Sequence, residues 1–485
     1  MSQEKANINL TNWDIVGINP NDKNWTWGDM FCFWAINIQS LIGFSLIASL
    51  YLVYDLNILI VFTSCLLTGL LVAILSNFIG QPSQKYGLPF PVILRSSFGV
   101  GGARYVALLR GLVGIFMFGV QTFFISKSIG YLIRILFFYI NDTILEQEIF
   151  LSFLMGMDLI DWFSFISALL LQFYLFKQSQ HFIKSILNFS AWFVYLGLLI
   201  FIIILAGENS KEIISAFKLS ARTENFVSRE NFLALISITG TLFAYFSIVI
   251  LNIGDFSRYI KNSSENSKGN FSLLINFIIF SFASVFIVLG ADIVMAKLLI
   301  DVDQLLTNPT DIIGKIDNNY LTVIAIIFIL VASGSTNLIA NYIPTQNALL
   351  NLFPKSFDKT NSGLFIIILG LVFGALWLPI LSQSGALSII DTIGSFFGPI
   401  GGIIIADYYL IKNKEYISKD IFSDSKSAAY FYSNGWQIKG IYTMSIGFIF
   451  AASTIWNEDL RFLQSFAWLI GAFVSYVTYY LLASD

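Results

Sequence analysis

The sequence predicts an all-α membrane protein with about twelve transmembrane helices. Of its 485 residues, 56% are hydrophobic and only 12% are charged, and the mean hydropathy is +0.75. Soluble domains carry about 25% charged residues, so this composition indicates a chain that lies in lipid. Apolar runs of about 20 residues recur along nearly the whole length, and a helix of that length crosses a bilayer. A β-barrel would show shorter segments of alternating polarity.

The apolar runs, bounded by polar, Gly or Pro residues, place the expected spans in order. They lie near residues 27–53, 57–80, 103–139, 160–177, 182–206, 232–253, 271–297, 320–346, 363–383, 386–411, 438–456 and 462–482. The first 26 residues are polar and lack an apolar core followed by a small-residue cleavage site. This pattern predicts a retained tail rather than a signal peptide.

The connections between the spans differ in their cation content. Every second connection carries cations: Lys85, Arg95 and Arg104; Lys177 and Lys184; Arg258, Lys261 and Lys268; Lys355 and Lys359; Lys412, Lys414, Lys419, Lys426 and Lys439. The segment from Asn141 to Asp161 has acids and neither Lys nor Arg. The loop from Glu208 to Glu230 mixes both signs, but longer external segments follow the positive-inside rule less closely. The rule therefore predicts cytoplasmic termini for a multi-pass protein of the plasma or inner membrane.

Polar residues interrupt three of the expected spans at mid-depth, where a lipid-facing helix would not tolerate them. They are Asn37, Gln39 and Ser40 in span 1, Thr239 to Thr241 in span 6, and Ser333 to Asn337 with Asn341 in span 8. Spans 1 and 6 are five apart. That spacing is expected if two inverted repeats place unwound helices around a midplane site.

The chemically reactive side chains are too few for an intramembrane enzyme, so we expect no catalytic residue and no cofactor. His181 is the only histidine and lies in a polar connection, and Cys32 and Cys65 fall in separate apolar runs. Such a set supplies neither a zinc site nor two axial histidines for a haem. A channel would need a repeated ring of like groups. A few convergent polar groups with aromatic walls near mid-membrane are instead typical of a carrier.

Four stretches in order resemble motifs of the nucleobase:cation symporter-1 family, whose members carry purines, pyrimidines, hydantoins and allantoin. They are Lys85–Gly99 in the loop after span 2, Met117–Gln121 in span 3, Leu251–Tyr259 after span 6 and Gly398–Tyr409 at the end of span 10. The resemblance extends from about residue 25 to 440. It implies a leucine-transporter-like five-plus-five inverted repeat with broken spans 1 and 6.

This architecture divides the chain into four parts. They are a cytoplasmic tail at 1–26, a ten-span transport core at 27–411 with repeats near 27–206 and 232–411, a cytoplasmic loop at 412–437 and two accessory spans at 438–485.

The resemblance assigns Gln39, Gln121 and Asn341 to the polar side of a substrate site. A carboxamide can pair with the alternating N–H and C=O edge of a uracil, hydantoin or ureide without bringing charge into a low-dielectric site. The alternative for each residue is an interhelical amide hydrogen bond of about 1 kcal/mol.

The family places two tryptophans around the substrate ring, and this sequence has Met117 and Phe246 at the matching positions. Base–aromatic stacking contributes about 1–3 kcal/mol, whereas a sulfur–aromatic contact contributes roughly 0.3–1.5 kcal/mol. One wall is therefore softer and roomier, which suits a bulkier or less planar ligand. The alternative is that Met117 only packs a helix interface.

The family's sodium site matches the carbonyls of Ala35, Ile38 and Ala332 and the hydroxyls of Ser335 and Thr336. Oxygen ligands without a carboxylate suit a weakly held monovalent cation. The alternative is that the hydroxyls bond back to the preceding helical turn. For proton coupling, Asp292 and Asp391 are the candidate carriers, because they lie in apolar runs. Asp255, Arg258 and Asp407 lie at cytoplasmic helix ends and are expected to be structural.

The expected function is cation-coupled import of a uracil-, allantoin- or hydantoin-type compound by alternating access. The alternatives are a non-transporting membrane sensor on the same fold and a proton-coupled cytosine or purine permease. We expect a monomer with a nucleobase-like substrate, sodium or a proton and the lipid bilayer as partners, and no nucleic-acid partner.

Overall fold

The computed structural model describes residues 10–39, 57–221, 228–297 and 319–484. Within these ranges the chain is helical and forms no sheet, only isolated β-bridges such as that between Trp25 and Ile260. Ten helical segments in this part of the chain are long and apolar enough to cross a membrane. The predicted all-α membrane fold is confirmed.

The helices follow one another along the chain with short connections. Their bounds are α1 Trp27–Ile38, α3 Ile58–Tyr86, α4 Phe90–Ile140, α5 Glu148–Leu151, α6 Leu159–Phe176, α7 Gln180–Ser220, α8 Arg229–Asn252, α9 Gly254–Ser257, α10 Ser263–Phe271, α11 Leu273–Lys297, α13 Asn319–Asn337, α14 Ile343–Leu352, α15 Lys359–Ala375, α16 Ala386–Gly394, α17 Phe397–Ala406, α18 Ile438–Trp456 and α19 Ala467–Ala483. Three π-helical turns are η3 Leu338–Tyr342, η4 Trp377–Leu381 and η5 Asp407–Ile411.

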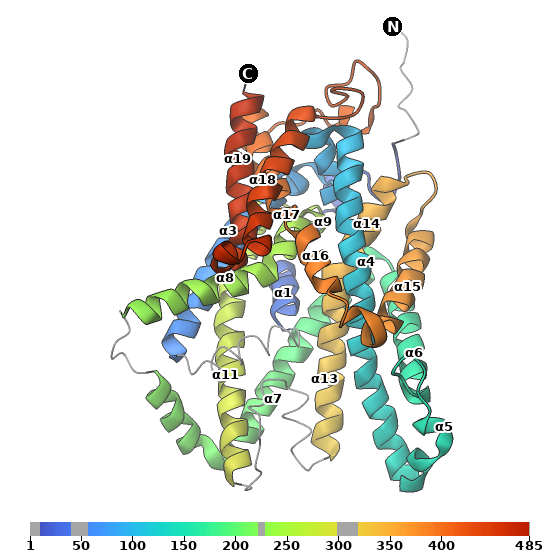
Figure 1. Ribbon diagram of the computed structural model, residues 1–485, viewed down its shortest axis with the longest axis vertical. Coiled ribbons are helices and arrows are strands. Elements are labelled where there is room, and N and C mark those ends of the chain that lie inside the picture. The colour runs from blue at the N-terminus through green and yellow to red at the C-terminus, as the bar shows by residue number, and fades with distance from the viewer. Residues whose placement is uncertain (1–9, 40–56, 222–227, 298–318, 485) are drawn as a thin grey trace.

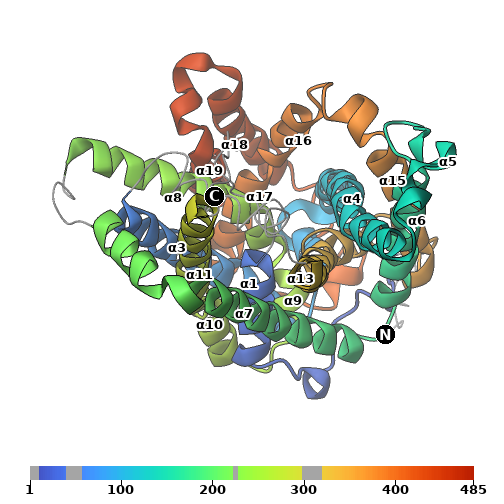
Figure 2. The ribbon, with the colours of Figure 1, turned by 90° about the horizontal axis from the view of Figure 1, so that it is seen from below.

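The bundle is elongated, and α1 lies inside it. The C-terminal end of α19 and the loop before α18 lie at one end, whereas α11, α13 and the later part of α4 reach the other end (Figure 1). Seen along the axis, α1 is surrounded by other helices (Figure 2), and it packs against α7, α10, α11 and α13. All residues from Asp29 to Ile38 are buried. The polar groups at the end of α1 are therefore held in the interior.

Several predicted spans are interrupted or continued in ways that the apolar runs do not indicate. The predicted span 320–346 comprises α13, η3 and part of α14, and span 386–411 is interrupted between α16 and α17. In contrast, α8 is continuous through Thr239–Thr241 and ends at Asn252, just before α9. The second half of the predicted span 27–53 lies outside the described residues. The total of about twelve spans and the broken spans 1 and 6 therefore stay predictions.

The expected loop Lys85–Gly99 is largely helical, because α4 begins at Phe90 and continues for 51 residues. Pro91 in the first turn favours this start, since its missing N–H would be unpaired there anyway. Gly99 then bends the helix, with φ 73° and ψ 172°. A Cβ at Gly99 would clash with the carbonyl oxygen of Gly435. Only glycine fits this bend, where α4 meets the loop before α18.

Replacing Gly99 by alanine is expected to lower the melting temperature, because this backbone region costs a non-glycine residue roughly 1–3 kcal/mol. Thermal unfolding in detergent, followed by tryptophan fluorescence, measures the change. Gly207→Ala in α7 is the control, since a Cβ there meets no atom within 4 Å. Equal melting temperatures for the two variants would contradict the requirement for glycine at the bend.

The C-terminal helices are joined to the bundle through a buried ion pair. Asp407 in η5 lies 2.6 Å from the Lys412 Nζ. The same carboxylate accepts hydrogen bonds from the Ser97 Oγ of α4 at 2.7 Å and from the Tyr479 Oη of α19 at 2.8 Å. Nearby, α17 and α19 approach so closely that a Cβ on Gly402 would clash with the Ala472 carbonyl. The expected structural role of Asp407 agrees with these contacts.

Candidate functional site

Two of the three predicted substrate amides contact each other in the interior. The Asn341 Nδ2 of η3 donates to the Gln121 Oε1 of α4 at 2.8 Å. The Gln121 Nε2 donates to the Ser333 carbonyl of α13 at 3.2 Å. Because η3 is a π-helical turn, the helix widens at Asn341, a geometry found frequently at functional sites. The structure thus brings α4, α13 and η3 together through uncharged polar groups.

A second layer of amides fixes the orientation of this pair. The fully buried Asn337 accepts a hydrogen bond from Asn341 at 2.9 Å and donates to the Gln172 Oε1 of α6 at 2.8 Å. Asn337 also donates to the Thr122 Oγ1 at 3.0 Å, and Gln172 donates to the same oxygen at 3.1 Å. A buried network whose members are paired holds its side chains rigidly.

Gln172 and Thr122 were not among the predicted site residues. Gln172 is nevertheless a buried amide in the apolar run Leu159–Phe176. A polar residue at that depth is a signal that could have pointed to it.

Gln39, the third predicted amide, lies at the end of α1. Its side chain is 4% exposed, and its Nε2 donates to the Ala191 carbonyl of α7 at 3.3 Å. Its Oε1 is buried and has no hydrogen-bond partner within the described residues. Such an unpaired acceptor costs about 1–3 kcal/mol. A ligand N–H could remove that cost.

The carbonyls at the end of α1 face polar groups of other helices. The Ile36 carbonyl accepts from the Thr336 Oγ1 of α13 at 3.0 Å, and the Asn37 carbonyl accepts from the Tyr245 Oη of α8 at 3.3 Å. Tyr245 is the sequence neighbour of the predicted Phe246 and was not singled out. Counting along the sequence cannot distinguish two adjacent aromatic residues that point in different directions.

Three of the five predicted sodium ligands are assembled within α13. The Ala332 carbonyl accepts from the Ser335 Oγ at 3.0 Å and from the Thr336 Oγ1 at 2.9 Å, and Ser335 also donates to the Val331 carbonyl at 2.7 Å. The hydroxyls therefore do bond back to the preceding turn. Donation uses only their hydrogens, so the oxygen lone pairs remain able to bind a cation.

The two predicted ligands from α1 lie close to this group along the chain. Ala35 and Ile38 flank Ile36, the residue that Thr336 contacts. The donor set of carbonyls and hydroxyls therefore fits a monovalent cation in kind.

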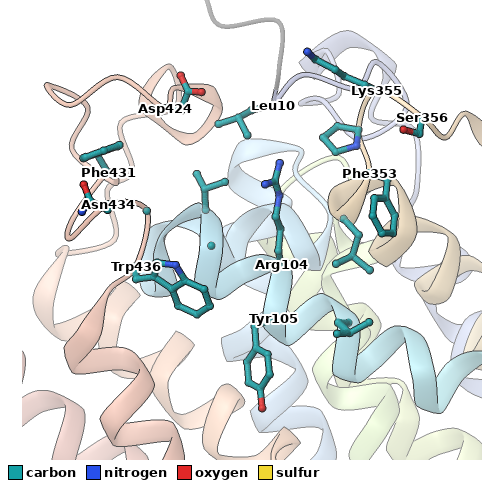
Figure 3. A pocket seen from close by; sticks show the side chains of 16 residues that line it. Leu10, Arg104, Tyr105, Phe353, Lys355, Ser356, Asp424, Phe431, Asn434 and Trp436 are labelled. Atoms are coloured by element: carbon teal, nitrogen blue, oxygen red, sulfur yellow. The ribbon is translucent and has the colours of Figure 1, made fainter.

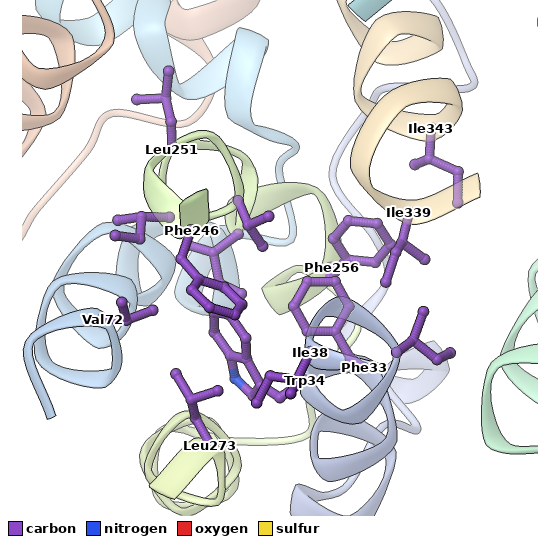
Figure 4. Packing of buried hydrophobic residues seen from close by; sticks show 14 of the residues in the cluster. Phe33, Trp34, Ile38, Val72, Phe246, Leu251, Phe256, Leu273, Ile339 and Ile343 are labelled. Carbon is purple, nitrogen blue, oxygen red and sulfur yellow. The ribbon is translucent and has the colours of Figure 1, made fainter. Parts of the chain in front are cut away.

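The predicted walls Met117 and Phe246 lie in different surroundings. Phe246 is 2% exposed and points into the main apolar cluster beside Trp34 (Figure 4), with its ring centre 5.3 Å from that of Phe277. Met117 on α4 is partly buried and packs near Phe116 and Val120. A wall role for each residue stays a prediction.

The acidic residues divide into exposed and buried groups. Asp292 and Asp391 are exposed on the outside of the bundle, whereas Asp255 is buried and accepts from Asn347 at 2.9 Å and from the Phe90 N–H at 3.1 Å. Burial raises the pKa of Asp255 to about 7, while the Asn347 hydrogen bond and the charge of Arg258 oppose that shift. No group of three His, Cys, Asp or Glu side chains that could hold a metal occurs in the part of the chain that the structure covers.

An all-helical bundle with uncharged amides and helix-end carbonyls in its interior defines the class of a multi-pass membrane transporter rather than an enzyme. The family model described as "permease for cytosine/purines, uracil, thiamine, allantoin" matches residues 18–478. The chain belongs to this permease family, and the resemblance to the nucleobase:cation symporter-1 family is confirmed.

Similar proteins support this assignment at the level of sequence. The chain is 27% identical to an allantoin permease of Bacillus subtilis, over 99% of this chain and 94% of that protein. It is 29% identical to the purine-uracil permease NCS1 of Arabidopsis thaliana, over 91% of this chain and 70% of that protein.

Solved structures support the fold. Mhp1, a nucleobase-cation-symport-1 family transporter with bound bromovinylhydantoin, superposes with a TM-score of 0.71 at 16% identity, covering 97% of this chain and 95% of Mhp1. A Na⁺-coupled sialic acid symporter superposes with a TM-score of 0.65 at 12% identity, covering 96% of this chain and 91% of that protein. The predicted transporter fold is confirmed.

Proposed function

We propose that this protein is a cation-coupled secondary transporter that imports a uracil-, allantoin- or hydantoin-type compound by alternating access. The observation that carries the proposal is the contact between Gln121 and Asn341, held in place by Asn337. This pair presents donors and an acceptor without charge, which suits the N–H and C=O edge of such a ring. Gln39, Met117 and Phe246 complete the proposed substrate site, within a transport core at 27–411.

We propose sodium as the coupling ion, bound by the carbonyls of Ala35, Ile38 and Ala332 and the hydroxyls of Ser335 and Thr336. The close approach of Thr336 to α1 supports this site, as does the sodium coupling of the structurally similar sialic acid symporter. A proton-coupled permease is the second candidate. Its carriers would be Asp292 or Asp391, which the exposed positions of both residues disfavour.

Uptake by the purified protein in liposomes tests the proposal. An inward sodium gradient should drive accumulation of labelled uracil, allantoin or hydantoin above the outside concentration. Binding without accumulation would instead identify a sensor on the same fold. A proton uncoupler added to the same liposomes distinguishes the two coupling ions.

Substituting Met117 by tryptophan is expected to favour flat heterocycles, because base–aromatic stacking contributes about 1–3 kcal/mol. Competition of unlabelled uracil, hydantoin and allantoin against one labelled ligand measures the ranking before and after the change. Leu112→Trp on the outer face of α4 is the control. An unaltered ranking would mean that Met117 only packs against its neighbours.

We propose that both termini are cytoplasmic in the plasma or inner membrane. A cysteine replacing Glu146 should then be labelled from outside intact cells, and one replacing Lys419 only after permeabilisation. Both positions are exposed, whereas the native Cys32 and Cys65 are buried and give little background. Reversed labelling would overturn this orientation.

A further inference from the structure

A pocket of about 950 Å³ lies at the end of the bundle that carries the C-terminus. It is enclosed by the early turns of α4, the connection between α14 and α15, and the loop that leads into α18 (Figure 3). None of the residues assigned to the substrate or cation site lines it.

The pocket lies at the level where spans end. Leu352, the last residue of α14, and Trp436, two residues before α18, both contribute to its wall. Tyr105 and Leu108 of α4 line it as well, and they are 38% and 44% exposed. Aromatic residues at the ends of spans mark the membrane–water interface. The pocket therefore borders both the water and the lipid.

Two cations at this pocket have no partner. Arg104 and Lys355 make no hydrogen bond or ion pair within the described ranges, and the Arg104 Nε is buried. Figure 3 shows the Arg104 side chain rising into the pocket, while Tyr105 points the opposite way. The acidic side chain in the wall, Asp424, has interactions of its own. An unpaired guanidinium and ammonium at one site favour a bound anion.

A third cation lies directly behind the pocket. Arg95 is 1% exposed and donates to the Asn351 Oδ1 at 2.7 and 3.0 Å, and to the carbonyls of Leu10 at 3.2 Å and Ile421 at 3.3 Å. All of these acceptors are neutral, so its charge is not compensated by a carboxylate there. Because Leu10 also lines the pocket, the charge of Arg95 adds to the positive potential around Arg104.

We propose that this pocket binds the headgroup of an anionic phospholipid from the adjoining leaflet, with the phosphate at Arg104 and Lys355. The acyl chains would run along Tyr105, Leu108 and Leu112, which share one exposed face of α4 at helical spacing. Basic pockets between transmembrane helices bind such headgroups, with about 1 kcal/mol per cation near the surface. This inference does not depend on the identity of the transported solute.

Native mass spectrometry of the full-length, delipidated protein titrated with phosphatidylglycerol tests the proposal. Arg104→Gln and Lys355→Gln should each weaken binding about fivefold, and the double variant about 30-fold. Arg104→Lys keeps the charge and should retain most of the binding. The double variant Lys261→Gln with Lys268→Gln is the matched control, because it removes the same charge from exposed positions outside the pocket. It should bind within about twofold of the unaltered protein.

Three outcomes would overturn the proposal. One is equal binding of phosphatidylcholine, whose headgroup has no net charge. Another is unchanged lipid binding by the Arg104 and Lys355 double variant, as expected if the chain's own first nine residues occupy the pocket. The third is a rise in melting temperature with inorganic phosphate but none with phosphatidylglycerol, which would identify a site for a soluble anion.

Discussion

Replacing Thr336 by valine is expected to remove most of the sodium dependence of substrate binding. Valine keeps the shape of the side chain but deletes the oxygen that lies at the Ala332 and Ile36 carbonyls. Coupling free energies of 1–3 kcal/mol correspond to about 5- to 150-fold changes in affinity. Sodium should tighten substrate binding by such a factor in the unaltered protein and by less than about twofold in the variant. Isothermal titration with and without sodium measures both.

The design separates the cation site from general damage to the helix. Thr63→Val in α3 is the control, because its hydroxyl also bonds back to a carbonyl one turn earlier, at 2.7 Å, but lies outside the proposed site. Substrate affinity without sodium should be nearly the same in all three proteins, and Ser335→Ala should resemble Thr336→Val. An undiminished sodium effect in Thr336→Val would exclude this threonine as a ligand. If uptake by the unaltered protein ignores sodium but collapses with an uncoupler, the sodium site is wrong and Asp292 and Asp391 become the candidates.

Replacing Gln121 by alanine is expected to weaken substrate binding by about 1–3 kcal/mol, or roughly 5- to 150-fold, because buried polar groups of the ligand lose their partner. The variant also removes the acceptor of the Asn341 Nδ2. Equilibrium binding of labelled ligand in detergent measures the dissociation constant, and the melting temperature checks that the protein stays folded.

Two further glutamine variants make this result specific. Gln178→Ala, in the exposed connection after α6, should leave affinity unchanged. Gln172→Leu removes a member of the second layer, which does not contact Gln121 directly. It should lower affinity less than Gln121→Ala, since it only loosens Asn337. A folded Gln121→Ala protein with full affinity would remove Gln121 from the site.

The sequence predicts the parts of this molecule that depend on local patterns. The apolar run at 438–456 has the same bounds as α18, because the ends of a span are marked by local polar residues. The family motifs likewise identify Gln121 and Asn341, which the structure places 2.8 Å apart.

Features that depend on distant contacts could not be predicted in this way. The bend at Gly99 requires the approach of Gly435, and the role of Gln172 requires Asn337 beside it. The widening at η3 and the orientation of Tyr245 toward α1 are also set by packing across helices. A one-dimensional pattern contains no term for such encounters.

The carboxylate of Asp407 has a consequence for how far the polypeptide can be shortened. A fragment ending before Ile438 would contain the whole proposed core, yet it would lack the phenol of Tyr479 and the backbone of Ala472 that covers Gly402. The fragment would then expose an ion pair and a glycine-lined groove to hydrocarbon. The last two helices are thus part of the minimal unit that can be inserted and stay folded, and they cannot be treated as a dispensable appendage.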